Sequence, residues 1–209
     1  QDKNDEAIKA YEEAIKLDPK LAIAWYNEGN AFDDLGKYDE AIKAYDEAIR
    51  IDPNYAKAWY NKGIVLKNQG KYDEAIKAYD EAIRIDPNHT RAMINKANAL
   101  NIQGKYNEAI EAYDEAIRID PNHARAWYNK GIALKNQGEY DEAIKAYDEA
   151  IRIYPYYAKA WYNKGNVFKD VFLEDGLHMN KKGYDIWGKV IGGFLKYLNY
   201  EYHEPKTLT

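Results

Sequence analysis

The chain has 209 residues, of which 31% are charged and 46% are hydrophobic, a balance that excludes a disordered chain and a membrane-spanning one. Its net charge of −5 argues against a general nucleic-acid-binding surface. The sequence has no Cys and no Ser, which excludes disulfides, thiolate metal sites and Cys or Ser nucleophiles. We therefore expect a soluble, mostly helical, cytoplasmic protein that needs no cofactor or metal and binds neither nucleic acid nor membrane.

Two residue types recur every 34 residues along most of the chain, which is typical of a stacked repeat protein. The first recurring position holds Trp25, Trp59, Met93, Trp127 and Trp161, and the second holds Pro19, Pro53, Pro87, Pro121 and Pro155. Within residues 55–88 the pattern predicts one helix over about 56–68 and a second over about 72–85. Gly70 lies in the turn between them, and Asp86-Pro87-Asn88 ends the second helix.

In chain order, the pattern begins in the middle of a repeat and ends in the middle of another. A second-helix half repeat over 1–20 comes first, and a first-helix half repeat over 157–170 comes last. The four complete repeats between them are 21–54, 55–88, 89–122 and 123–156. The two half repeats are complementary in phase, so the N-terminal helix of one molecule could pack on the C-terminal end of another.

The residues at fixed places in each repeat carry a resemblance to a known family. These places hold Trp59, Gly63, Leu66, Ala75, Tyr79, Ala82 and Pro87, and in the next repeat Met93, Ala97, Leu100, Ala109, Tyr113, Ala116 and Pro121. Over about residues 1–170 the chain resembles the tetratricopeptide-repeat (TPR) family, although Lys62 and its equivalents stand where that family usually has Leu. The resemblance implies an all-α fold, a right-handed superhelical solenoid of antiparallel helix pairs, whose first helices line a concave groove for a protein or peptide.

One stripe of the first helices contains the residues that we expect to bind a peptide. An Asn recurs at one place in every first helix, and an Asn row can bond to the backbone of an extended peptide. A cation recurs in four first helices and attracts carboxylates, while flanking tyrosines add amphipathic contact area. The predicted peptide-binding residues are Asn27, Lys57, Tyr60, Asn61, Arg91, Asn95, Asn98, Arg125, Tyr128, Asn129, Lys159, Tyr162 and Asn163.

Both features of this stripe also have a structural interpretation, which the sequence leaves open. The asparagines could bond only to neighbouring backbone, and the cations could balance the acidic second helices. Residues 55–68 contain Lys57, Lys62 and Lys67 and no acid, whereas residues 21–34 contain Glu28, Asp33 and Asp34 and no base. We therefore expect a groove that is basic from the second repeat onward, acidic at its N-terminal end, and suited to an acidic peptide.

Residues 171–209 form a tail outside the repeat pattern. Its segment around Asp175 and His178 resembles the last block of the GDSL (SGNH) esterase family, in which the Asp and His are triad members. Because the chain has no Ser, we interpret this block as a remnant or a fusion joint. An apolar stripe over about 182–198 predicts a helix that caps the open end of the solenoid.

The sequence therefore predicts a protein-interaction scaffold and not an enzyme. The first alternative is a self-assembling or engineered repeat module whose incomplete terminal repeats stack, and the second is an esterase remnant. His89 and His123 occupy a loop position shared with Tyr55 and Tyr157, so we expect them to be structural. No metal-ligand cluster or phosphate-binding glycine motif is present in the sequence.

Overall fold

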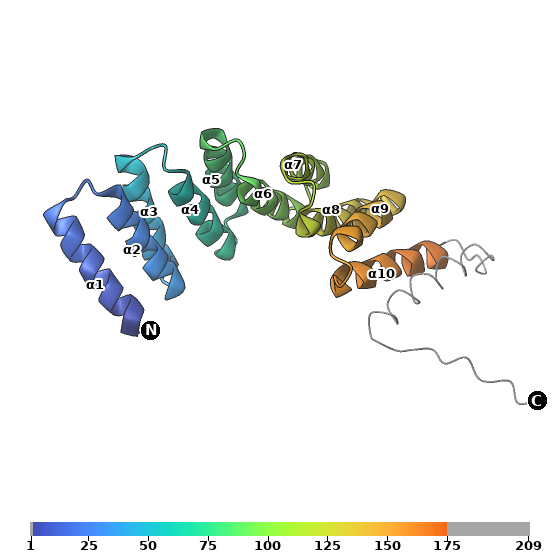
Figure 1. The fold of residues 1–209 in the computed structure, drawn as a ribbon, viewed down its shortest axis with the longest axis horizontal. Coiled ribbons are helices and arrows are strands. Elements are labelled where there is room, and N and C mark those ends of the chain that lie inside the picture. The colour runs from blue at the N-terminus through green and yellow to red at the C-terminus, as the bar shows by residue number, and fades with distance from the viewer. Residues whose placement is uncertain (1, 175–209) are drawn as a thin grey trace, which may run out of the picture. The chain divides into compact units, whose positions relative to one another are not determined.

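The computed structural model describes residues 2–174, and this part of the chain consists of ten α-helices without a strand (Figure 1). The helices are α1 (Asp2–Leu17), α2 (Ala22–Asp34), α3 (Tyr38–Ile51), α4 (Ala56–Asn68), α5 (Tyr72–Ile85), α6 (Thr90–Ile102), α7 (Tyr106–Ile119), α8 (Ala124–Gln137), α9 (Tyr140–Ile153) and α10 (Ala158–Glu174). The bounds of α4 and α5 confirm the two helices predicted for the repeat 55–88.

Local sequence signals explain where these helices begin and end. The second helix α5 carries Asp73 and Glu74 in its first turn and Arg84 in its last, the charge order that the helix dipole favours. Each complete repeat turns between its helices at a glycine with positive φ, a conformation that other residues adopt only with strain. These glycines are Gly36, Gly70, Gly104 and Gly138, with φ between 71° and 89°.

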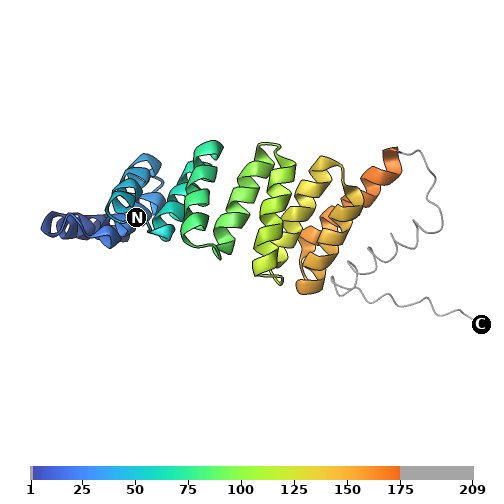
Figure 2. The same cartoon turned by 90° about the horizontal axis from the view of Figure 1, so that it is seen from above.

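The chain divides into two compact modules, Gln1–Asp120 and Pro121–Thr209, which we call the N-terminal and C-terminal modules. In the N-terminal module each first helix packs against the second helix of its own repeat and against the second helix before it, in the order α1 to α7. The helices of this module, blue to green in Figure 2, follow one another along the stack in chain order. Successive first helices also contact each other, α2 with α4 and α4 with α6, whereas successive second helices in this module do not. The first helices therefore lie on the inner side of the curved stack.

The described part of the C-terminal module repeats this arrangement with fewer helices. Helices α8 and α9 form a pair, and α10 packs against both of them. The helix α10 has 17 residues, whereas α4 has 13. It continues past residue 170, where the repeat pattern ends, because Phe172 stands at the place of the turn glycine Gly70. The predicted capping helix and the esterase-like block lie outside the described residues.

Small residues and one tyrosine form the core of each repeat. In α5, Ala75, Ala78, Tyr79 and Ala82 are almost completely buried. A Cβ added to Gly63 of α4 would lie 2.6 Å from the ring of Tyr79, so the glycine is what allows α4 and α5 to approach. Equivalent contacts join Gly29 to Tyr45 and Gly131 to Tyr147. The third repeat has Ala97 at this place and still buries both Ala97 and Tyr113.

Candidate peptide-binding surface

The predicted stripe lies on the side of the first helices where they contact one another, which we call the inner face. In the N-terminal module this face includes Lys57 and Arg91, whose side chains are exposed and form no ion pair with the described residues. Arg125 and Lys159 are exposed in the same way in the C-terminal module. Each module therefore presents cations that no described carboxylate neutralises.

The recurring asparagines link neighbouring repeats through their side chains. Asn61 Nδ2 donates to the hydroxyl of Tyr26 at 3.2 Å and to Oδ1 of Asn30 at 2.8 Å. The corresponding bonds join Asn95 to Tyr60 at 3.0 Å and, in the C-terminal module, Asn163 to Tyr128 at 2.8 Å. In all three bonds the acceptor is the hydroxyl of a tyrosine 35 residues earlier. The alternative expectation, that these asparagines bond only to neighbouring backbone, is therefore wrong for these three. Asn95 Oδ1 accepts no hydrogen bond from the described residues.

Two tyrosines of the stripe, Tyr60 and Tyr128, each contact one ring in their own repeat and one in the next. The ring of Tyr60 lies 6.1 Å from the ring of Tyr79 in its own repeat and 4.8 Å from His89 in the next. Tyr128 lies in the same way between Tyr147, at 6.0 Å, and Tyr157, at 4.8 Å. Tyr162 on α10 differs, because 67% of its surface is exposed. These ring contacts were not predicted from the sequence, although the spacing of 29 residues from Tyr60 to His89 and from Tyr128 to Tyr157 was a signal for them.

Asn98, another predicted peptide-binding residue, supports a buried tyrosine of its own repeat. The hydroxyl of Tyr113 donates to Asn98 Oδ1 at 2.6 Å, and Tyr45 donates to Asn30 Oδ1 at 2.8 Å. The alternate repeats have Ile64 and Ile132 at this place, and the buried hydroxyls of Tyr79 and Tyr147 have no hydrogen-bond partner within residues 2–174. Burial raises the pKa of Tyr79 and Tyr147 above the usual range, so both hydroxyls stay protonated.

The lysines that depart from the family pattern make ion pairs between repeats and do not belong to the inner face. Lys96 Nζ lies 2.6 Å from Asp80 Oδ1 of the preceding second helix. Lys62 pairs in the same way with Asp46, and its Nζ lies 5.4 Å from the centre of the Trp59 ring. The expectation that Lys57, Lys62 and Lys67 together make the groove basic therefore needs correction, because Lys62 is already neutralised.

The first repeat has a carboxylate where the later repeats have this lysine. Glu28 occupies the place of Lys62 and is 6% exposed. Burial and, second, the charge of Glu12 on α1 raise the pKa of Glu28. Burial and the neighbouring Asp34 likewise raise the pKa of Asp33. Glu28 therefore contributes to the junction between α1 and α2, and only Asp33 and Asp34 remain as the acidic end of the inner face.

The tetratricopeptide repeat family matches the chain in overlapping segments over 1–56, 26–90, 60–124, 94–158 and 128–168. The chain belongs to this family. These matches reach residue 168 and give no support to the esterase resemblance of the tail.

Solved TPR structures share the fold, whereas no curated protein matches the sequence. A crystal structure of MamA is 29% identical, covers 75% of this chain and 91% of its own, and has a TM-score of 0.70. YrrB, described as a TPR protein with an unusual peptide-binding site, is 22% identical with a TM-score of 0.72 over 92% of this chain and 95% of its own. MamA from Desulfovibrio magneticus RS-1 is 23% identical with a TM-score of 0.70, over 85% and 93%.

Each first helix of the TPR repeats is positioned by one or both of two loop features. The indole Nε1 of Trp59 donates to the carbonyl oxygen of Pro53 at 3.2 Å, and the other three repeat tryptophans bond to their prolines in the same way. His89 Nδ1 accepts from the backbone N–H of Ala92 at 3.3 Å, and His123 makes the equivalent cap. The prediction that both histidines are structural is confirmed.

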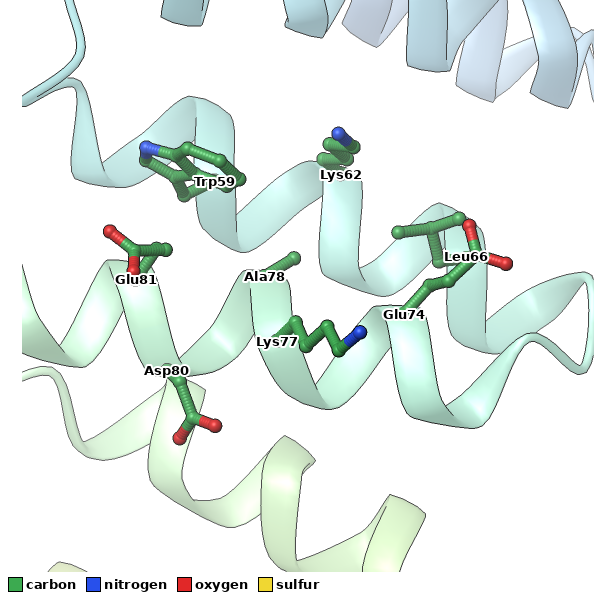
Figure 3. A pocket seen from close by; sticks show the side chains of 8 residues that line it. All are labelled: Trp59, Lys62, Leu66, Glu74, Lys77, Ala78, Asp80 and Glu81. Carbon is green, nitrogen blue, oxygen red and sulfur yellow. The ribbon is translucent and has the colours of Figure 1, made fainter.

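A pocket of about 550 Å³ lies between α4 and α5 of the second TPR repeat (Figure 3). Trp59, Leu66 and Ala78 give it an apolar wall, and charged side chains surround that wall. Two of these, Lys62 and Asp80, are already held in ion pairs with neighbouring repeats. Among the described residues there is no metal-binding cluster and no helix long and apolar enough to cross a membrane.

Proposed function

We propose that this TPR protein is an interaction scaffold that binds an extended, acidic peptide on the inner face of its first helices. Membership of the TPR family supports the general function, and YrrB, which shares the fold, is described as having a peptide-binding site. The acidic preference rests on the exposed cations of the inner face, which form no ion pair with the described residues.

Lys57 and Arg91 occupy equivalent places on α4 and α6, and neither has a carboxylate partner among the described residues. Other lysines of the same helices, such as Lys62 and Lys96, are held by aspartates of the preceding repeat. Two unpaired cations on neighbouring first helices are suited to two carboxylates of one extended chain, because charge-assisted hydrogen bonds are the strong ones.

The asparagine row contributes a prearranged acceptor. The bond from Asn95 Nδ2 to the Tyr60 hydroxyl fixes the amide, and its Oδ1 is left to accept a peptide N–H. Asn61 has both a tyrosine and an asparagine partner for its Nδ2, so its carbonyl has the same role. Asn98 Oδ1 already accepts from Tyr113, and in this proposal Asn98 supports the surface without supplying an empty acceptor.

The C-terminal module offers an equivalent set of groups for the same kind of ligand. Arg125 and Lys159 correspond to Lys57 and Arg91, and Asn163 is fixed by Tyr128 as Asn95 is fixed by Tyr60. Asn129 stands at the corresponding place on α8. In this proposal catalysis has no part, since Asp175 and His178 have no Ser to activate anywhere in the chain.

Isothermal titration calorimetry with three blocked decapeptides, rich in Glu, Gln or Lys, tests the proposal. We expect the Glu-rich peptide to bind most tightly and the double variant Lys57→Ala/Arg91→Ala to weaken it at least about tenfold, since each lost charged hydrogen bond is worth about 1.5–3 kcal/mol. The double variant Lys9→Ala/Lys43→Ala removes the same charge from exposed sites on α1 and α3 and should leave affinity unchanged. Equal losses in both variants, or no preference for the Glu-rich peptide, would contradict the acidic preference.

A further inference from the structure

Three isoleucines interrupt the polar stripe of the inner face in the N-terminal module. Ile23 lies in the first turn of α2 and is 46% exposed, and Ile102 is the last residue of α6 and is 58% exposed. Ile64 lies on α4 between them and is half-buried. The equivalent places in the other repeats of this module hold polar residues, which are Lys57 and Arg91 for Ile23, Asn30 and Asn98 for Ile64, and Asp34 and Asn68 for Ile102.

Hydrogen bonding in the core would favour Asn, and not Ile64, at the middle of these places. In the first repeat Tyr45 of the second helix donates to Asn30 at this place, and the third repeat has the same kind of bond. Ile64 offers no acceptor, and the buried hydroxyl of Tyr79 has no hydrogen-bond partner in the described part of the chain. An unpaired buried hydroxyl lowers stability, so the isoleucine is kept at a cost to the repeat.

The three isoleucines follow a diagonal across the first helices, which we call the apolar diagonal. These helices run in the same direction, because each repeat reverses the chain twice, and they contact one another in the order α2, α4, α6. Counted from the place of Ile23, Ile64 stands seven residues later on its helix and Ile102 stands eleven residues later. At about 1.5 Å per residue, these places lie about 10 and 16 Å further along the helix axis.

The apolar diagonal separates the charges of the inner face. Lys57 and Arg91 occupy the place of Ile23 on α4 and α6, so both cations lie on one side of the diagonal. Asp33 and Asp34 lie at the other end of α2, on the opposite side. A bound chain that follows the diagonal therefore has cations along one edge and carboxylates beside the other, and its own acidic residues are attracted to the edge with Lys57 and Arg91.

The ends of the apolar diagonal lie at places that stay open inside the stack. Helix α4 contacts a first helix on each side, α2 and α6. Its residues at the places of Ile23 and Ile102 are Lys57 and Asn68, and both are exposed. The exposure of these two places therefore does not depend on what adjoins α2 or α6.

We propose that the peptide bound on the inner face carries, besides its acidic residues, an apolar residue at every fourth position, and that these residues contact the apolar diagonal. This proposal rests on the proposed function, because it concerns the same surface. Packed helices lie about 8–10 Å apart, so one step of the diagonal is about 11–14 Å. Four residues of an extended chain span about 13 Å, and residues four apart point to the same side.

The apolar diagonal also distinguishes the two modules. At the three kinds of place that it uses, the described first helices of the C-terminal module have only one isoleucine, Ile132. The other places of that module hold polar or charged residues, which are Arg125, Asn136, Lys159, Asn166 and Asp170. A peptide with the apolar spacing should therefore prefer the N-terminal module, whereas a peptide with acidic residues alone is suited to both.

Isothermal titration calorimetry of the full chain with two blocked Glu-rich decapeptides of identical composition tests the spacing. One peptide has leucines at positions 1, 5 and 9, and the other has them at positions 1, 4 and 7, where neighbouring leucines of an extended chain point to opposite sides. We expect the first peptide to bind at least about tenfold more tightly, because only its leucines can all be buried on the apolar diagonal.

Substitutions on the apolar diagonal test whether it is the source of this preference. The double variant Ile23→Gln/Ile102→Asn should reduce the preference to less than about twofold and leave the affinity for a leucine-free Glu-rich peptide unchanged. Leu17→Gln removes an exposed apolar side chain from α1 and should have no effect. Ile64→Asn should weaken binding of the spaced peptide, whereas Ile132→Asn makes the same exchange in the C-terminal module and should not. Circular dichroism checks that the variants keep their helix content.

The outcomes separate this proposal from the proposed function. Equal affinity of the two leucine peptides, a preference that survives Ile23→Gln/Ile102→Asn, or equal losses in Ile64→Asn and Ile132→Asn would overturn the apolar diagonal and leave the acidic preference intact. A leucine-spaced peptide that binds as tightly with Gln as with Glu would instead contradict the acidic preference, while its dependence on the spacing would still support the diagonal.

Discussion

The junction between α1 and α2 and the junction between α3 and α4 have the same backbone arrangement but different side-chain links. Trp25 Nε1 donates to the carbonyl oxygen of Pro19 at the first junction, and Trp59 Nε1 donates to that of Pro53 at the second, both at 3.2 Å. The interior junction adds the ion pair of Lys62 with Asp46. At the first junction Glu28 and Glu12 occupy these two places, and their charges repel.

This difference shows that two sets of residues have separate roles in the repeat. Small core residues and the loop hydrogen bond define how one repeat stacks on the next, since both junctions share them. The charged and polar links between repeats then set how strongly each junction holds. Because each repeat contacts only its neighbours, stability adds up junction by junction, and a weak first junction affects α1 before it affects the interior.

The largest expected effect comes from giving the interior junction the charges of the first one. Lys62→Glu replaces an ion pair by two carboxylates at a side chain that is only 20% exposed, and it should lower the free energy of unfolding by about 2 kcal/mol. Urea denaturation followed by circular dichroism measures this loss. Lys43→Glu makes the same charge change at an exposed site on α3 and should cost less than about 0.5 kcal/mol. Similar losses in the two variants would show that the pair does not strengthen the junction.

The converse substitution, Glu28→Lys, should strengthen the first junction by about 1 kcal/mol, because it places a cation beside Glu12. Its pH dependence gives a sharper test. The pKa of Glu28 is raised in the folded chain, so its stabilising contribution is complete below the unfolded-state value of 4.5 and is lost as pH rises through the folded value.

Hydrogen exchange of the α1 amides, corrected for intrinsic rates, measures the opening of this junction. We expect α1 of the unsubstituted protein to open more readily at pH 7 than at pH 4.5, and Glu28→Lys to remove this difference. Glu6→Lys, an exposed site on α1, should leave the pH dependence as it is. Loss of the pH dependence in the Glu6 variant would assign it to the net charge of α1 and not to Glu28.

The smallest expected effect compares two buried tyrosines inside the repeats. Tyr45 donates to Asn30, so Tyr45→Phe should cost about 1 kcal/mol. The Tyr79 hydroxyl has no partner in the described part of the chain, so Tyr79→Phe should be neutral or stabilising by up to about 1 kcal/mol. Thermal unfolding of both variants measures the difference, and Tyr147→Phe should behave like Tyr79→Phe. Equal effects of Tyr45→Phe and Tyr79→Phe would mean that the bond to Asn30 contributes nothing net.

The fold could be predicted from the sequence because the turn residues that end helices and the spacing of the apolar residues give the same helix bounds in each repeat. Gly70 needs its positive φ and Pro87 cannot continue a helix, so the bounds of α4 and α5 follow from local chemistry. The end of α10 did not follow from the repeat, because the tail replaces the turn glycine by Phe172.

The candidate site was only partly predictable, because helical spacing gives the direction of a side chain and not its partner. The exposed face of Lys57 and Arg91 follows from that spacing. The bond from Asn61 to Tyr26 and the pair of Lys62 with Asp46 depend on how closely one repeat stacks on the next. A signal for the ion pairs was nevertheless present, since an Asp stands sixteen residues before each of Lys62, Lys96 and Lys164.

The hydrogen bond between each repeat tryptophan and its proline has a practical consequence for following this protein in solution. Each of these half-buried indoles is fixed at one loop and packs on the helices beside it, so its fluorescence emission reports the opening of that junction. Trp25 reports on the start of the stack and Trp161 on its last described helix. The third repeat has Met93 at this place and therefore no tryptophan fluorescence of its own. Variants that keep a single tryptophan would therefore turn the 34-residue repeat into a set of optical reporters, one for each of four positions along the chain.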